Sequence, residues 1–175
     1  MPVSGYRWRL VTISTHNSWL PGDKRGWRSR DHKRHSSGDY RDPPPSTEHE
    51  GLRRWAHEHS GPKAIIPRPV RSRIAAALIG KIQEMKYRCH CVSVSATHSH
   101  LLVELPDDLA RIRKVVGQWK QAASHAVRDV MPGKVWAEGG DWEPIDTPER
   151  LRIEFVYVTT KQGPGAHVWS FRNAQ

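Results

Sequence analysis

A pair of strand-like segments joined by only two residues constrains the fold of this chain most. Residues 89–95 (CHCVSVS) and 98–105 (HSHLLVEL) both have the composition and length of strands, and only Ala96 and Thr97 separate them. The simplest structure for such a pair is an antiparallel hairpin. Pro106 follows directly and ends the second strand. We therefore expect a β-hairpin in the middle of the chain.

Amphipathic helices are predicted on both sides of this hairpin. Before it, apolar residues recur every three or four positions over about 69–86, starting at a Pro that suits the first helical turn. After it, Asp107 or Asp108 can cap a second helix that runs to about Val130. The hairpin is thus expected to lie between two helices that each bury one face.

Three further segments complete the pattern. Residues 6–15 (YRWRLVTIST) alternate as a strand does, and residues 135–145 contain two short strand-like pieces around a Gly-Gly turn. Thr147 and Pro148 then begin a last helix, which Gly163 ends. The resulting order β-α-β-β-α-β-α predicts a ferredoxin-like α+β sandwich, an antiparallel sheet of four or five strands with helices on one face.

A long polar segment interrupts this pattern after the first strand. Residues 19–69 are rich in Pro, Gly and charged side chains and show little hydrophobic periodicity apart from Leu52–His57. We expect an insertion loop with one helical turn, inside a single domain that spans residues 1–175.

The charge and the cysteines limit the setting in which the chain works. The formal net charge of +10 favours a polyanionic partner, which is nucleic acid or an anionic membrane surface. No apolar run is long enough to span a bilayer, and Met1–Arg9 lacks the pattern of a signal peptide. Cys89 and Cys91 lie too close together in one strand to form a disulfide, which favours the reducing cytoplasm.

Two histidines at the start of the second hairpin strand are candidate metal ligands. His98 and His100 are two residues apart, so their imidazoles project from the same face of the strand and can share one divalent ion. The spacing alone is weak, because His57 and His59 repeat it within the polar segment. The pair at 98–100 leads into a rigid apolar strand, whereas two histidines on a solvated sheet face remain the alternative.

Tyr157, in the last helix, is a candidate nucleophile. Taken alone, it fits an ordinary aromatic core position better. A phenol has a pKa near 10, so its attack on phosphorus is chemically sensible only beside a cation that polarises the phosphate. A metal held by the histidines would supply that cation. A second metal hypothesis, a zinc site that joins Cys89 and Cys91 to the histidines, is disfavoured, because a tight turn would place both cysteines at the far end of the hairpin.

Four segments, in order, carry a resemblance to a known family. They are TISTHNSWLPGDKRGW (12–27), THSHLLVELP (97–106), VVGQWKQAAS (115–124) and VWAEGGDWEPIDTPERLRIEFVYV (135–158). Together they resemble the HUH single-strand transposases, especially the REP-associated tyrosine transposases. The resemblance implies a ferredoxin-like core in which His98 and His100 hold a divalent metal, Mg²⁺ or Mn²⁺, and Tyr157 is the catalytic tyrosine.

The third metal ligand departs from the family pattern. The family commonly has Gln or Asn four residues after the tyrosine, but Lys161 occupies that position and cannot coordinate a metal while it is protonated. Gln162, one residue later, is the first candidate. Other candidates are Glu104, Asn17 and Asp23.

The resemblance also implies the reaction and the partner. Tyr157 is expected to cleave and rejoin single-stranded DNA through a 5′-phosphotyrosine, beside a DNA hairpin or palindromic repeat, in a monomer or homodimer. Two rivals are a catalytically impaired relative that binds hairpin DNA or RNA, which Lys161 favours, and a nuclease of the replication-initiator or relaxase type. The candidate nucleic-acid contacts are Trp19 and Trp27, as stacking platforms, and Arg71, Arg73, Lys114 and Lys120, as phosphate contacts.

Overall fold

The structure, a computed structural model, describes residues 2–29, 33–38 and 42–172. Within these residues, five strands form one sheet: β1 (Tyr6–Ser14), β2 (Cys89–Val94), β3 (His98–Pro106), β4 (Asp141–Ile145) and β5 (His167–Ser170). The helices are α1 (Glu50–His59), α2 (Arg71–Glu84), α3 (Leu109–Ala126) and α4 (Pro148–Thr160), and a short 3-10 turn, η1 (Arg68–Val70), precedes α2. No helix in the described ranges is long and apolar enough to cross a bilayer.

The strand order confirms the predicted fold class. The sheet runs β4-β1-β3-β2-β5, and all neighbouring strands are antiparallel. The hairpin β2–β3 forms as predicted, and β1 pairs with β3 rather than with β2. This order, with β3 between β1 and β2, is that of a ferredoxin-like α+β fold. The edge strand β5 extends the predicted pattern, and the strand expected at Val135–Trp136 is reduced to a single bridge between Thr15 and Trp136.

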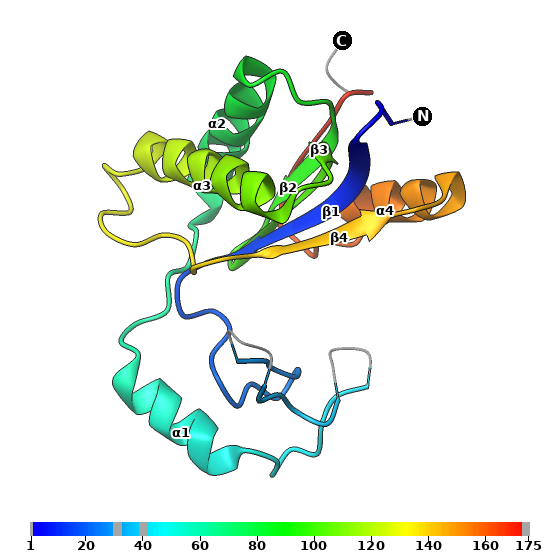
Figure 1. Cartoon of the computed structure of the whole chain (residues 1–175). Helices are drawn as coiled ribbons and strands as arrows, with labels where there is room; N and C mark the ends of the chain where they lie inside the picture. Colours follow the sequence, from blue (N-terminus) through cyan, green and yellow to red (C-terminus); the bar gives the residue numbers. More distant parts are fainter. Residues whose placement is uncertain (1, 30–32, 39–41, 173–175) are drawn as a thin grey trace.

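Helices cover both faces of the sheet (Figure 1). On one face, α2 and α3 pack against Val11 and Ile13 of β1, with Trp119 of α3 fully buried in this larger core. On the other face, α4 packs its buried Val158 against Leu102 of β3. The expectation that helices lie on one face holds for α2 and α3, whereas α4 covers the opposite face. Both faces need cover because β1 and β3 carry apolar side chains on each side.

The first residues of α3 and α4 show how local chemistry begins these helices. The Asp108 side chain accepts hydrogen bonds from the backbone nitrogens of Ala110 (2.8 Å) and Arg111 (3.1 Å). The Thr147 hydroxyl accepts one from the nitrogen of Arg150 at 3.1 Å, and Pro148 takes the first helical position. Both caps satisfy donors that a helix leaves unpaired at its start. The cap of α4 fixes where Tyr157 falls along the helix.

The polar segment after β1 leaves the sheet and then returns to it (Figure 1). Within 19–69, residues 30–32 and 39–41 lie outside the described residues. The single helical turn expected near Leu52–His57 is the ten-residue helix α1. The segment rejoins the sheet where the nitrogen of Ile66 donates to the carbonyl of Ala96, in the β2–β3 turn. The insertion therefore starts and ends beside the same end of β3.

Candidate active site

His98 and His100 lie side by side on the α4 face of β3. Their ring centroids are 4.8 Å apart, and His100 is only 7% exposed. Thr12 lies directly across from His100 in the β1–β3 register, and its hydroxyl is 2.9 Å from Nδ1 of His100. This contact leaves Nε2 as the ring nitrogen of His100 that is free to meet a ligand.

Burial keeps both imidazoles uncharged near neutral pH. Burial, followed by repulsion from His98, lowers the pKa of His100 to about 3. Burial also lowers the pKa of His98, although a hydrogen bond to Gln162 opposes the shift, and the charge of Arg25 lowers it further. A neutral imidazole has a lone pair to donate. The pair is therefore in the protonation state that a metal ligand requires.

Tyr157 lies next to this pair. Its ring centroid is 5.5 Å from that of His100, in an edge-to-face arrangement, and the residue is 38% exposed. The neighbouring Val158 is fully buried against the sheet and anchors the last turns of α4. Tyr157 is thus a half-open side chain at the edge of the α4–sheet interface, not the core aromatic that position alone suggested.

Gln162 reaches the histidines because α4 ends early. The helix stops at Thr160, and Lys161 is its exposed C-terminal cap. Gln162 then folds back, and its Nε2 donates to the carbonyl oxygen of Tyr157 at 3.0 Å. The same side chain hydrogen-bonds His98. Because Nε2 is engaged by Tyr157, the oxygen Oε1 is the atom left to face the imidazole.

The other candidate third ligands are held elsewhere. Glu104 forms an ion pair with Arg88. Asn17 donates its side-chain amide to the carbonyl of Ser60. Asp23 pairs with Arg25 at 2.6 Å. Within the described part of the chain, no group of three His, Cys, Asp or Glu side chains could hold a metal ion. Gln162 is the candidate that the fold brings to the histidine pair.

The cysteines lie away from the histidine pair along the hairpin. Burial raises the pKa of Cys91 to about 12 and that of Cys89 higher still. In the β2–β3 register, Cys91 lies opposite Leu102 and Cys89 opposite Val103, further along the hairpin than His98 and His100. The zinc hypothesis that joined them to the histidines therefore has no structural support.

The two tryptophans of the polar segment differ in exposure. Trp27, which the sequence predicts to stack on bases, is only 8% exposed, and its ring contacts His49 edge-on, so it offers no open stacking surface in this structure. Trp19 is 44% exposed, and the guanidinium of Arg25 lies 4.0 Å from its ring centroid. Arg25 donates to the carbonyl oxygen of Ser18 at 2.9 Å, and the Ser18 hydroxyl donates to that of Thr97, next to His98, so this part of the segment lies near the site.

The four predicted phosphate contacts lie in the α2–α3 layer, on the face opposite α4, and three of them are engaged within the fold. Arg71 donates to the carbonyls of Ile66 and Gly165, and Lys120 donates to those of Ala137 and Gly139. Arg73 pairs with Asp129, and Lys114 is exposed. Burial lowers the pKa of Lys120. We infer that Arg71 and Lys120 stabilise the loops whose carbonyl oxygens they bind.

Two neighbours of His100 were not identified from the sequence. Thr12 meets it from β1, 88 residues away, and Ser93 lies opposite it on β2 with a buried hydroxyl that has no hydrogen-bond partner among the described residues. Only strand register could have revealed either one. The middle residue of the motif, Ser99, points to the α2–α3 core, as its pairing with the buried Ile13 shows.

Comparisons with known proteins add one distant likeness. No family model and no curated protein matches the chain. Among solved structures, the chain is similar to a REP-associated tyrosine transposase bound to a REP hairpin, with 14% identity and a TM-score of 0.46 over 90% of this chain and 67% of that one. At this low sequence identity, the roles proposed for individual residues rest on the geometry of this chain alone.

Proposed function

We propose that this chain is a metal-dependent tyrosine transposase of the HUH type, an endonuclease that cleaves and rejoins single-stranded DNA. One observation carries the proposal. His98 and His100 come from the central strand β3, Tyr157 from helix α4, and Gln162 from the loop after that helix. Their side chains converge on one point of the α4 face of the sheet.

The donor atoms at this point fit a divalent metal. Two neutral imidazoles and one amide oxygen are ligands that a divalent ion such as Mn²⁺ accepts, and the partly exposed Tyr157 beside them leaves this side accessible to solvent. His98, His100 and Oε1 of Gln162 would hold Mg²⁺ or Mn²⁺. When bound, the ion would supply the positive charge that polarises the scissile phosphate.

Tyr157 would perform the bond exchange. Its phenolic oxygen attacks the phosphorus of a backbone phosphodiester, the phenolic proton passes to water, and the bond from phosphorus to the 3′ oxygen breaks. The 3′ oxygen takes up a proton from water, which leaves a free 3′-OH and a 5′-phosphotyrosine. Attack by another 3′-OH reverses these steps and rejoins a strand without an external energy source.

The substrate follows from access and charge. Tyr157 is partly exposed beside the sheet, where a flexible single strand can present a phosphate, and the net charge of +10 attracts a polyanion. Trp19, with Arg25 over its ring, offers one stacking surface near His98 for an unpaired base. We propose a DNA hairpin or palindromic repeat with a single-stranded flank as the substrate, and a cytoplasmic location.

A cleavage assay tests this function. A labelled DNA hairpin with a single-stranded flank is incubated with the chain and Mn²⁺ or Mg²⁺, and the Tyr157→Phe variant and chelator are the controls. We expect cutting by the unaltered chain only, with metal. If the unaltered chain binds the hairpin but does not cut it under any metal, the alternative of a catalytically impaired binding protein replaces this proposal.

A further inference from the structure

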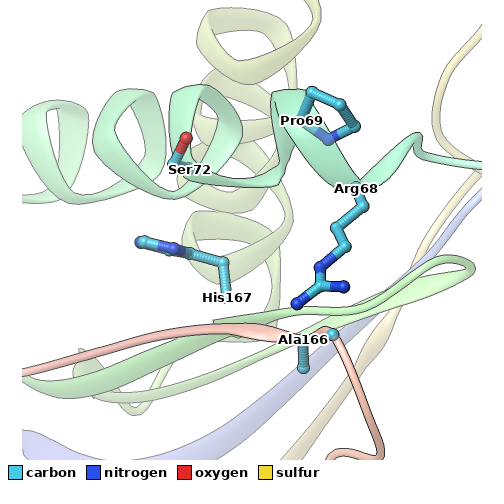
Figure 2. Close-up of a pocket in the computed structure, with 6 residues that line it drawn as sticks. Arg68, Pro69, Ser72, Ala166 and His167 are labelled. Atoms are coloured by element: carbon cyan, nitrogen blue, oxygen red, sulfur yellow. The ribbon is translucent and has the colours of Figure 1, made fainter.

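An open pocket of about 520 Å³ lies at the edge strand β5, on the α2 face of the sheet, opposite to the face that carries His98, His100 and Tyr157. Arg68 of η1 and Ser72 of α2 line it on one side, and His167 of the edge strand β5 lines the opposite wall. Figure 2 shows the guanidinium of Arg68 above Ala166, with the ring of His167 beneath α2. These side chains come from two elements that lie far apart in the sequence.

The lining of this pocket combines the cationic Arg68, the polar Ser72 and His167 and three small or apolar residues, and it contains no carboxylate. Its residues are Arg68, Pro69, Ser72, Gly165, Ala166 and His167. Arg68 is exposed, and within the described ranges its guanidinium has no hydrogen-bond or ion-pair partner. A guanidinium has five donors that match the oxygens of a phosphate, so an unpaired one at a pocket wall favours an anionic ligand.

Gly165 brings a second guanidinium to the same place. Arg71 donates to its carbonyl oxygen at 2.6 Å. A Cβ at position 165 would lie 3.4 Å from Nε of Arg68 and 3.4 Å from a terminal nitrogen of Arg71, and the φ of +81° is one that other residues rarely adopt. The glycine therefore keeps the space between the two guanidinium groups open.

The pocket and the active site share one loop. Gln162, beside His98, accepts a hydrogen bond from Ser95 on its carbonyl oxygen, and Gly165 is only three residues further along. Three residues span at most about 11 Å, so Gly165 lies within that distance of Gln162. To reach the pocket, a strand whose phosphate lies at Tyr157 would pass round the edge strand β5 and place there a phosphate a few nucleotides away.

We propose that the Arg68–Ser72–His167 pocket binds a backbone phosphate of the DNA substrate, a few nucleotides from the cleavage position. This assignment rests on the proposed function, because it takes single-stranded DNA as the ligand. Arg68 supplies the charge, and the Ser72 hydroxyl and the His167 imidazole supply further hydrogen bonds. The pocket sets where along the strand Tyr157 cuts, since it fixes one phosphate relative to another.

Binding without cleavage tests the pocket separately from catalysis. Affinity for a fluorescent hairpin with a single-stranded flank is measured in EDTA by anisotropy, over a range of salt concentrations. Arg68→Gln should weaken binding on the order of fivefold at about 100 mM salt and reduce the slope of log K against log salt by about 0.7. Arg113→Gln, which removes the same charge from an exposed position of α3, is the matched control and should change neither quantity.

A second arm separates a strand phosphate from free phosphate. Inorganic phosphate at millimolar concentration should shift the NMR signals of Arg68 Nε and the His167 ring, and the oligonucleotide should displace it. Equal effects of the Arg68 and Arg113 variants, or phosphate that the oligonucleotide does not displace, would overturn the proposal. If the variants differ as expected but the unaltered chain never cuts DNA with metal, only the proposed catalytic function fails.

Discussion

The side-chain nitrogen of Gln162 lies 3.0 Å from the carbonyl oxygen of Tyr157, so the residue after the helix cap folds back over the last turn of α4. The carbonyl of Tyr157 also accepts from the nitrogen of Lys161 at 3.0 Å. These two bonds tie the amide beside His98 to the backbone of the tyrosine. Any shift of the end of α4 would therefore move the proposed nucleophile and the proposed third metal ligand together.

Loss of the Gln162 amide should weaken metal binding. Gln162→Ala removes Oε1, so the affinity for Mn²⁺ should fall by roughly tenfold or more, as measured by calorimetry or by the free Mn²⁺ signal in electron paramagnetic resonance. Lys161→Ala, one residue earlier and exposed, is the matched control and should keep the affinity of the unaltered chain. The ligand assignment is wrong if the two variants bind Mn²⁺ equally well.

Thr12 should position His100 through its hydroxyl. Thr12→Val keeps the shape and removes the hydrogen bond to Nδ1, which should lower Mn²⁺ affinity by about 10- to 100-fold. Thr12→Ser keeps the hydroxyl and should restore most of the affinity. Nitrogen chemical shifts of the His100 ring give a metal-free readout, because the tautomer ratio should change in the Val variant alone. If the His100 chemical shifts and the Mn²⁺ affinity are unchanged in the Val variant, Thr12 contributes packing but does not position His100.

We expect the buried hydroxyl of Ser99 to lower the free energy of unfolding. Its hydroxyl is fully buried on the α2–α3 side and has no hydrogen-bond partner among the described residues. Because burial of an unpaired hydroxyl costs about 1–3 kcal/mol, Ser99→Ala should raise the free energy of unfolding by about 1 kcal/mol in urea denaturation. Metal affinity should stay the same, since the side chain points away from the histidines. A destabilised variant would show that the hydroxyl has a partner.

We expect Glu104 to make the stability of the fold depend on pH in the acidic range. Burial opposes its ionisation, but the ion pair with Arg88 and the hydrogen bond from the nitrogen of Val3 prevail and hold its pKa below the usual 4.5. A carboxyl with a depressed folded-state pKa stabilises the fold above its unfolded pKa and loses that contribution as the pH falls through the folded value.

Thermal unfolding between about pH 3 and pH 7 checks this prediction. The melting temperature of the unaltered chain should fall below about pH 4.5, and Glu104→Gln should lower it at neutral pH while making the acid decline shallower. Asp146→Asn, at an exposed partner of Arg7, is a suitable control and should leave the acid decline nearly unchanged. Parallel curves for Glu104→Gln and the unaltered chain would contradict the assignment.

The sequence predicted the elements that depend on local pattern. The hairpin at 89–105 follows from strand-forming residues on either side of a two-residue turn, and α3 follows from an Asp cap and an apolar stripe. The spacing of His98 and His100 fixed their common face because side chains alternate along a strand. These features involve only neighbours in the sequence.

Features that depend on tertiary contacts could not be predicted from the sequence. Thr12 meets His100 only through the β1–β3 register, and no local pattern encodes the pairing of residues so far apart. Trp27 is buried by segments of an insertion that lacks periodicity, so its exposure could not be read from its neighbours. Gln162 approaches His98 because α4 ends at Thr160, and helix ends are uncertain by one or two residues even in a known structure.

Direct detection of the covalent intermediate tests the central claim most sharply. The chain is incubated with Mn²⁺ and a hairpin oligonucleotide whose single-stranded flank carries a label on the 3′ side of the cleavage position. We expect a denaturation-resistant protein–DNA adduct, which mass spectrometry of the digested protein assigns to Tyr157 and which the Tyr157→Phe variant does not form. Cleavage of the flank with no adduct at Tyr157, or equal cleavage by Tyr157→Phe, would contradict the proposed mechanism.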